Sequence, residues 1–151
     1  MMQTKVRLQR EDFDVAAETV ALTRGRTDIG ALVSFTGLVR ADDGLGMLEL
    51  EHYPAMAQKA LEAIEAEARQ RWRITDCLII HRYGKLEPGA RIVLVITASA
   101  HRDDAFAAAE FLMDYLKTRA PFWKRVTTAT GAQWVEAQGR DDDAAERWKG
   151  N

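Results

Sequence analysis

The chain has 151 residues, of which 47% are hydrophobic and 29% charged, and its formal net charge at pH 7 is −2. These values are typical of one globular domain and argue against a dedicated nucleic-acid-binding domain, which is usually basic. The sequence has no secretory signal, and no apolar run approaches the roughly 18 residues of a membrane span, so a cytoplasmic protein is expected.

The first half of the chain predicts strands and helices in mixed order. Lys5–Gln9 alternates polar and apolar residues and predicts a short edge strand, and Asp14 is suited to cap the helix that follows. Ile29–Arg40 is rich in β-branched and aromatic residues and predicts a strand that is broken or bulged at Gly37. Met47–Tyr53 alternates again, and we expect it to pair with that preceding strand.

The second half continues the mixture. Pro54 occupies the favoured first turn of a helix, and Cys77–Tyr83 and Arg91–Ser99 are apolar strands, the second of them central. Trp123–Thr127 and Gln133–Ala137 predict a hairpin. Residues 1–151 are therefore expected to form one α+β domain, with a mostly antiparallel sheet, packed helices and a polar tail at 139–151.

A long helix is expected between the central strand and Pro121, since proline disfavours helical geometry in the residue before it. Its apolar stripe is predicted to include Phe106 and Met113, with Lys117 at the edge of the stripe. The chain must then turn, which could fold Lys124 back toward Lys117. Two lysines in one pocket would lower each other's pKa and leave a neutral, nucleophilic amine.

A structural interpretation of these cations is also open at this point. Positive side chains in the last turn of a helix complement its dipole, and a lysine at a stripe edge can keep its ammonium group in water. Arg40, at the end of a strand, could likewise be solvated, and Arg102 could pair with Asp103 or Asp104. The functional alternative is that His101 and Arg102, where the central strand gives way to the helix, bind an anion there.

The sequence shows no motif for metal binding, nucleotide binding or serine-hydrolase chemistry. His52, His81 and His101 lack the spacing of metal ligands, and no cofactor is expected. The sequence contains no phosphate-binding glycine loop and no serine-hydrolase elbow. Cys77 lies within an apolar strand, where cysteine behaves as a small hydrophobic residue.

Several blocks resemble the catalytic (large) subunit of molybdopterin synthase, in order, from about Thr4 to Trp148. They are residues 34–40 (SFTGLVR), 50–54 (LEHYP), 99–102 (SAHR), 113–117 (MDYLK), 120–124 (APFWK) and 134–137 (WVEA). The resemblance implies an α/β-hammerhead fold and sulfur transfer in molybdenum cofactor biosynthesis. Such subunits convert cyclic pyranopterin monophosphate (precursor Z) to molybdopterin with sulfur from the C-terminal Gly-Gly thiocarboxylate of a small ubiquitin-like carrier. Two large subunits form a homodimer and each binds one carrier, which gives a heterotetramer.

The resemblance also implies roles for particular residues. The pocket lysines correspond to Lys117 and Lys124, the substrate-binding cations to Arg40, His101 and Arg102, and the residues lining the pocket to Phe35 and Met113. One departure concerns a family arginine, because Gln138 stands in its place here and Arg140 would have to substitute for it.

Two rival functions are open. The basic, aromatic segment Lys117–Arg125 could hold single-stranded nucleic acid by stacking and phosphate contacts, which the acidic net charge disfavours. The chain could also be a dimer subunit that has lost catalysis, but both pocket lysines are present.

Overall fold

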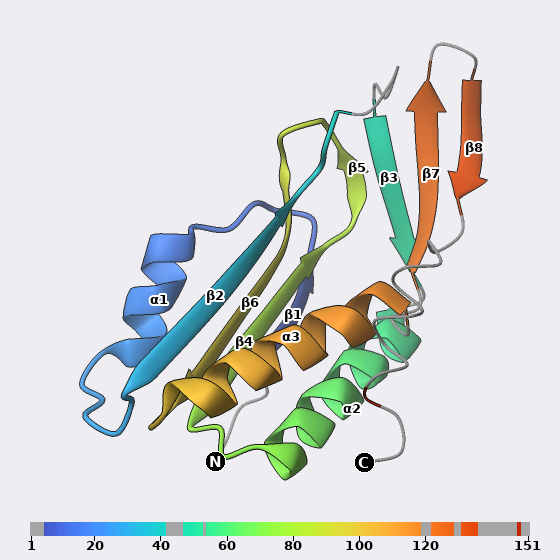
Figure 1. Cartoon of the computed structure of the whole chain (residues 1–151). Coiled ribbons are helices and arrows are strands. Elements are labelled where there is room, and N and C mark those ends of the chain that lie inside the picture. The colour runs from blue at the N-terminus through green and yellow to red at the C-terminus, as the bar shows by residue number, and fades with distance from the viewer. Residues whose placement is uncertain are drawn as a thin grey trace.

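The computed structural model describes residues 5–41, 47–52, 54–118, 122–128, 131–135 and 148, and for residues 123–128 and 131–135 it describes the backbone. The elements in chain order are β1 (Val6–Gln9), α1 (Val15–Thr23), β2 (Ala31–Leu38), β3 (Met47–His52), α2 (Pro54–Arg71), β4 (Asp76–Arg82), β5 (Gly84–Leu86), β6 (Arg91–Ser99), α3 (Arg102–Thr118), β7 (Phe122–Thr128) and β8 (Gly131–Val135). The strands form two four-stranded sheets, in the orders β1-β4-β6-β2 and β5-β3-β7-β8 (Figure 1). This arrangement confirms the predicted α+β fold.

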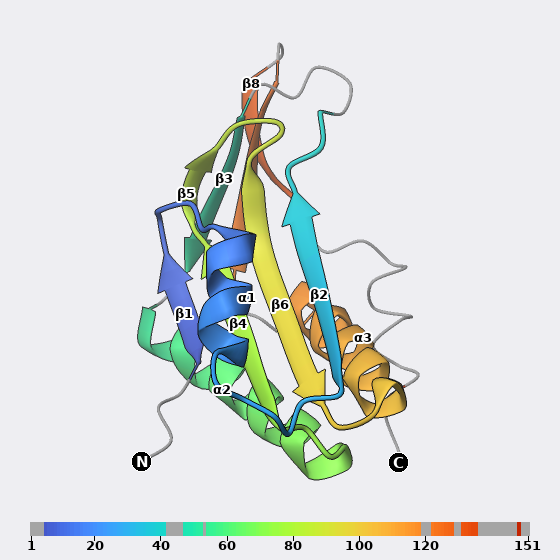
Figure 2. The same cartoon turned by 90° about the vertical axis from the view of Figure 1, so that its left-hand side faces the viewer.

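The β1-β4-β6-β2 sheet is covered on both faces, by α1 on one side and by α2 and α3 on the other (Figure 2). Its interior strands β4 and β6 are therefore almost continuously apolar. Alternate residues serve the two faces. Toward α1 the core contains Phe13, Leu22, Leu78, Ile80, Leu94, Ile96 and Ala98. Toward α2 and α3 it contains Ile79, Val93 and Val95 with Leu61, Phe111, Leu112 and Tyr115.

Most local predictions for this sheet are confirmed. β6 is central, between β4 and β2, and β1 lies at an edge, where it pairs in parallel with β4. Asp14 caps α1 by accepting a hydrogen bond from the Ala17 backbone N–H at 3.1 Å. The register of β2 against β6 shifts between Gly37 and Leu38, as expected for a bulge.

The predicted pairing of the segment that forms β3 is wrong. β3 pairs with β5 and β7 in the second sheet and not with β2. The predicted alternation is confirmed, because Leu48 and Leu50 are buried. Alternation shows which residues of a strand face the core, but it does not determine which strand lies alongside.

The predicted apolar stripe of α3 is also partly wrong. Phe106 is 62% exposed, whereas Ala105, Ala108 and Leu112 are fully buried. The small alanines let the helix approach β2 and β6 closely, so the buried stripe is rotated away from the larger Phe106. No helix in the described part of the chain is both long and apolar enough to cross a membrane.

Candidate active site

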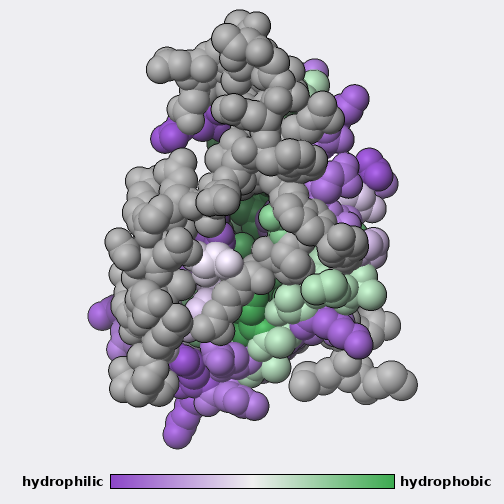
Figure 3. Space-filling model, turned by 90° about the vertical axis from the view of Figure 1, so that its right-hand side faces the viewer, coloured by the Kyte–Doolittle hydropathy of each residue, from purple (hydrophilic) through white to green (hydrophobic). Residues whose placement is uncertain are grey.

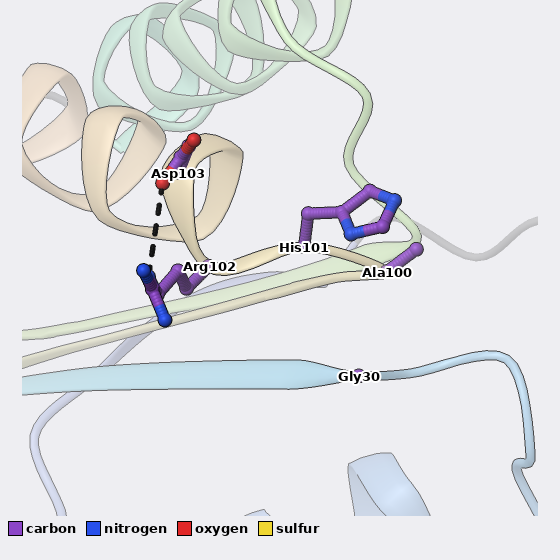
Figure 4. Close-up of a pocket in the computed structure, with 5 residues that line it drawn as sticks. All are labelled: Gly30, Ala100, His101, Arg102 and Asp103. Atoms are coloured by element: carbon purple, nitrogen blue, oxygen red, sulfur yellow. Dashed lines mark ion pairs between the residues drawn. The ribbon is translucent and has the colours of Figure 1, made fainter.

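The N-terminal end of α3 borders a pocket of about 360 Å³ lined by Gly30, Ala100, His101, Arg102 and Asp103 (Figure 4). The Gly30 N–H donates to the Ser99 carbonyl at 2.9 Å, which holds the two chain segments together. A Cβ atom at position 30 would lie 2.2 Å from the Ala100 carbonyl oxygen, so only glycine fits without a backbone shift. No sequence motif marks Gly30 as part of a site.

This pocket is suited to an anion. Unpaired N–H groups and the helix dipole attract negative charge to a helix N-terminus. The His101 ring and the Arg102 guanidinium point away from each other (Figure 4), and Arg102 lies 4.0 Å from Asp103. Both partners of that ion pair are more than four-fifths exposed, so water screens it and Arg102 can turn to a ligand at little cost.

The other end of α3 presents Lys117, which is exposed in the last turn of the helix. Met113, one turn earlier, is partly buried against the core. The next element, β7, starts at Phe122, and its Lys124 is in register with the buried Leu50 of β3.

Three site predictions fall partly or wholly outside the described residues. These are the Lys124 side chain, Gln138 and Arg140. Hydrophobic residues are visible at mid-height on the side of the molecule where α3 ends (Figure 3).

The predicted residues therefore form two separate groups within one chain. Arg102 and Lys117 are fifteen positions apart on a single helix, which at 1.5 Å per residue separates them by about 22 Å along its axis. His101 lies with Arg102 at one end, and Met113 with Lys117 near the other. One molecule of this chain does not bring the two groups into one pocket.

Phe35 and Arg40 complete the predicted set. Phe35 is opposite Val95, a core residue beneath α3, and so lies on the face of the sheet that α3 covers, yet it is 42% exposed. Arg40 follows the far end of β2, next to Val39, whose N–H donates to the Ala90 carbonyl at 2.8 Å.

Ala90 also lines a second pocket, of about 340 Å³, together with Met47, Arg82, Lys85, Leu86 and Glu87. Arg82 has a structural role there, because its guanidinium donates to the carbonyls of Arg10 and Arg91 at 2.9 and 2.8 Å. Sequence motifs do not reveal this pocket, because Met47 of β3 meets residues 82–90 only in the folded structure.

A cluster of rings adjoins the start of β7 and was also missed. His52 lies 4.3 Å from Tyr83 and 5.7 Å from Phe122 between ring centroids, and His81 stacks on Phe122 at 4.1 Å. The His52 Nδ1 atom is buried and has no hydrogen-bond partner among the described residues. Burial lowers the pKa of His52, which favours the neutral imidazole.

Cys77 is fully buried, which confirms the predicted core thiol. Its Sγ donates to Glu65 Oε2 at 3.2 Å, and burial raises the pKa of the thiol well above its usual range. A thiol in this state is a poor nucleophile. Among the described residues, no group of three or more His, Cys, Asp or Glu side chains could hold a metal ion.

Comparison with known proteins identifies the family. The family model described as "MoaE protein" matches residues 8–119. A molybdopterin synthase catalytic subunit of Mesorhizobium japonicum is 58% identical over 95% of this chain and 92% of its own length. A molybdopterin biosynthesis MoaE protein from Burkholderia ambifaria superposes with a TM-score of 0.85 at 51% identity, covering 99% of this chain and all of that one.

A more distant structure shares the fold. It is the complex of subunits 1 and 2 of molybdopterin-converting factor from Helicobacter pylori, one chain of which matches with a TM-score of 0.74 at 20% identity, over 91% of this chain and 92% of that one. The chain therefore belongs to the MoaE family, the catalytic subunits of molybdopterin synthase in molybdenum cofactor biosynthesis.

Proposed function

We propose that the chain transfers sulfur to cyclic pyranopterin monophosphate from the C-terminal thiocarboxylate of a small carrier subunit, and so forms the dithiolene of molybdopterin. The carrier is a ubiquitin-like protein that ends in Gly-Gly. The Helicobacter pylori structure, a complex of two converting-factor subunits, supports a two-subunit assembly of this kind. The inert Cys77 is consistent with a sulfur donor outside this chain.

The observation that carries the proposal is the position of the two lysines. Lys117 is exposed where α3 ends, and Lys124 lies in the strand that follows directly. Lys117 acts on the thiocarboxylate carbonyl or transfers a proton, and Lys124 stabilises the negative charge that develops. The hydrophobic residues visible on the side where α3 ends (Figure 3) are suited to contact an extended glycine tail.

The remaining residues bind the pterin. Arg40, His101 and Arg102 supply cationic and hydrogen-bonding groups for its phosphate, and Phe35 and Met113 line the pocket. Because Arg102 and Lys117 are about 22 Å apart along α3, they serve one substrate only if two copies of the chain share a site.

The exposed flank of α3 is suited to such a homodimer. At about 100° per residue, Phe106, Met113 and Lys117 lie within about 40° of one another around the helix. Phe35 and Phe106 are 42% and 62% exposed, so both offer apolar area to a partner chain. If a second copy packs here with its helix antiparallel, the partner's Arg102 lies beside Lys117, and two equivalent sites form.

The test is to mix the purified protein with a thiocarboxylated carrier and the cyclic pterin, and to follow product formation by mass. We expect the mass of the dithiolene product, and we expect Lys117→Ala to abolish it while the fold and carrier binding persist. Absence of product from the wild-type protein would refute the proposed reaction. Near-normal turnover by Lys117→Ala would remove that residue from the mechanism.

A further inference from the structure

Trp148, close to the C-terminus, packs into an aromatic cluster between α2 and α3. Its ring lies 5.6 Å from that of Trp72 and 5.7 Å from that of Phe111, at interplanar angles of 89° and 87°. Trp72 and Phe111 are themselves 5.3 Å apart, edge to face. Perpendicular aromatic pairs at these separations are favourable, so the cluster fixes the indole at the surface of α3.

The indole also makes a polar contact with α3. Its Nε1–H donates to Asp114 Oδ2 at 2.5 Å. A hydrogen bond to a carboxylate is shorter and stronger than one between neutral groups. The Nε1–H group is the only hydrogen-bond donor of the indole. The bond therefore restrains the Asp114 side chain and occupies part of its capacity to accept hydrogen bonds.

Asp114 is three residues before Lys117 on the same helix. Side chains at this spacing are neighbours on a helix surface. A carboxylate within about 4–6 Å favours the protonated form of an amine, which is not nucleophilic. How freely Asp114 can turn toward Lys117 therefore influences how much neutral amine is present.

We propose that Trp148 is a positioning residue for Lys117: by holding one oxygen of Asp114, it limits the pairing of that carboxylate with the Lys117 ammonium. This inference rests on the proposed role of Lys117 in sulfur transfer. It gives Trp148 an indirect role in the reaction, because the Asp114 carboxylate that it holds is about one helical turn from the Lys117 amine. A purely structural role for Trp148 makes a different prediction, because loss of the indole N–H would then change stability alone.

The experiment compares three variants by the pH dependence of Lys117 acetylation, measured with acetic anhydride and peptide mass spectrometry. In Trp148→Phe the ring remains and the N–H is lost, so we expect the midpoint of Lys117 reactivity to rise by about 0.3 pH units, the size of a helix-surface charge pair. In Asp114→Asn the carboxylate charge is lost, so the midpoint should fall. Trp72→Phe, the matched control, disturbs the same cluster but leaves the bond between Trp148 and Asp114, and should leave the midpoint unchanged.

The pH profile of turnover should move with the labelling midpoint, which makes Trp148→Phe about twofold slower at neutral pH. An unchanged midpoint in Trp148→Phe, or an equal shift in Trp72→Phe, would overturn the inference. If Trp148→Phe does not fold, Asp114→Asn still tests the inference. A midpoint of Lys117 reactivity that does not fall in Asp114→Asn would also overturn it. Labelling needs neither carrier nor pterin, so its outcome is separate from failure of the proposed reaction, which shows as absence of product from the wild-type protein.

Discussion

At the scale of single residues, His52 connects the fold to pH. Burial lowers its pKa, with a nearby Arg10 acting in the same direction and Glu51 in the opposite one. The unfolded chain, with an ordinary histidine pKa of about 6.5, therefore binds this proton more readily than the folded protein does. The stability that neutral His52 contributes is present above that pH and is lost as pH falls from there through the lowered pKa of the folded protein.

Replacing His52 with Phe should remove this effect, since the new ring can still pack against Tyr83 and Phe122 but cannot take up a proton. We expect the free energy of unfolding, from urea titrations at pH 7 and pH 5, to depend less on pH in His52→Phe than in the wild type. His101→Gln, at an exposed histidine, is the control and should retain the wild-type difference. An equal pH dependence in His52→Phe and the wild type would show that this imidazole is not linked to folding.

The residues of the candidate site were easier to name from the sequence than to place in space. Motifs in the chain supplied Lys117, Arg102 and Phe35, because the family resemblance is carried by short blocks. Gly30 was missed, since its importance comes from a carbonyl seventy residues later that leaves no room for a Cβ atom. The separation of Arg102 from Lys117 follows from helix length alone, a constraint that the motifs do not express.

At the scale of elements, Asp76 joins four segments of the fold. Its carboxylate lies 2.5 Å from Lys5 Nζ, 3.2 Å from an Arg26 nitrogen and 3.4 Å from an Arg69 nitrogen. It also accepts from the Cys77 N–H at 2.8 Å. These contacts tie β4 to the start of β1, to the segment after α1 and to α2.

The charge of Asp76 is therefore needed by the fold. Burial alone would raise its pKa, but the hydrogen bonds from Lys5 and Cys77, together with the charge of Arg69, outweigh burial and lower it. The stability gained is present above the ordinary aspartate pKa of about 3.9 and is lost as pH falls through the lowered value.

We expect Asp76→Asn to cost about 3 kcal/mol in the free energy of unfolding at pH 7, because it leaves three cations without their shared carboxylate. The variant should also lose less stability than the wild type on acidification. Asp28→Asn is the matched control. Asp28 pairs with Arg26 at an exposed position and should change stability little. Similar unfolding midpoints in urea for the two variants would contradict this account of Asp76.

The elements themselves were largely predictable. The apolar runs of β4 and β6 and the capping aspartate of α1 are local signals, and the structure agrees with each. The partner of β3 was not predictable, because its alternation fits any neighbouring strand. The buried face of α3 was misplaced because Ala105 and Ala108 are weak hydrophobic signals beside Phe106, although they contact the sheet.

At the scale of the whole molecule, one chain presents the parts of the candidate site without assembling them. The anion pocket is at the start of α3, the lysine is at its end, and Phe35 and Phe106 are exposed. A two-fold pairing of two chains would place each half-site against the other half. The proposed reaction therefore depends on a site that is shared between two copies of the chain.

Complementation between two inactive variants tests this claim most directly. Lys117→Ala and Arg102→Ala chains, each impaired alone, are co-assembled and assayed for the dithiolene product. Each mixed dimer contains one site with both residues intact, so random pairing should recover about a quarter of wild-type activity. Co-assembly of Lys117→Ala with the double variant, which leaves no intact site, should recover none. A mixture of the two single variants that is no more active than the sum of its separate components would contradict a shared site.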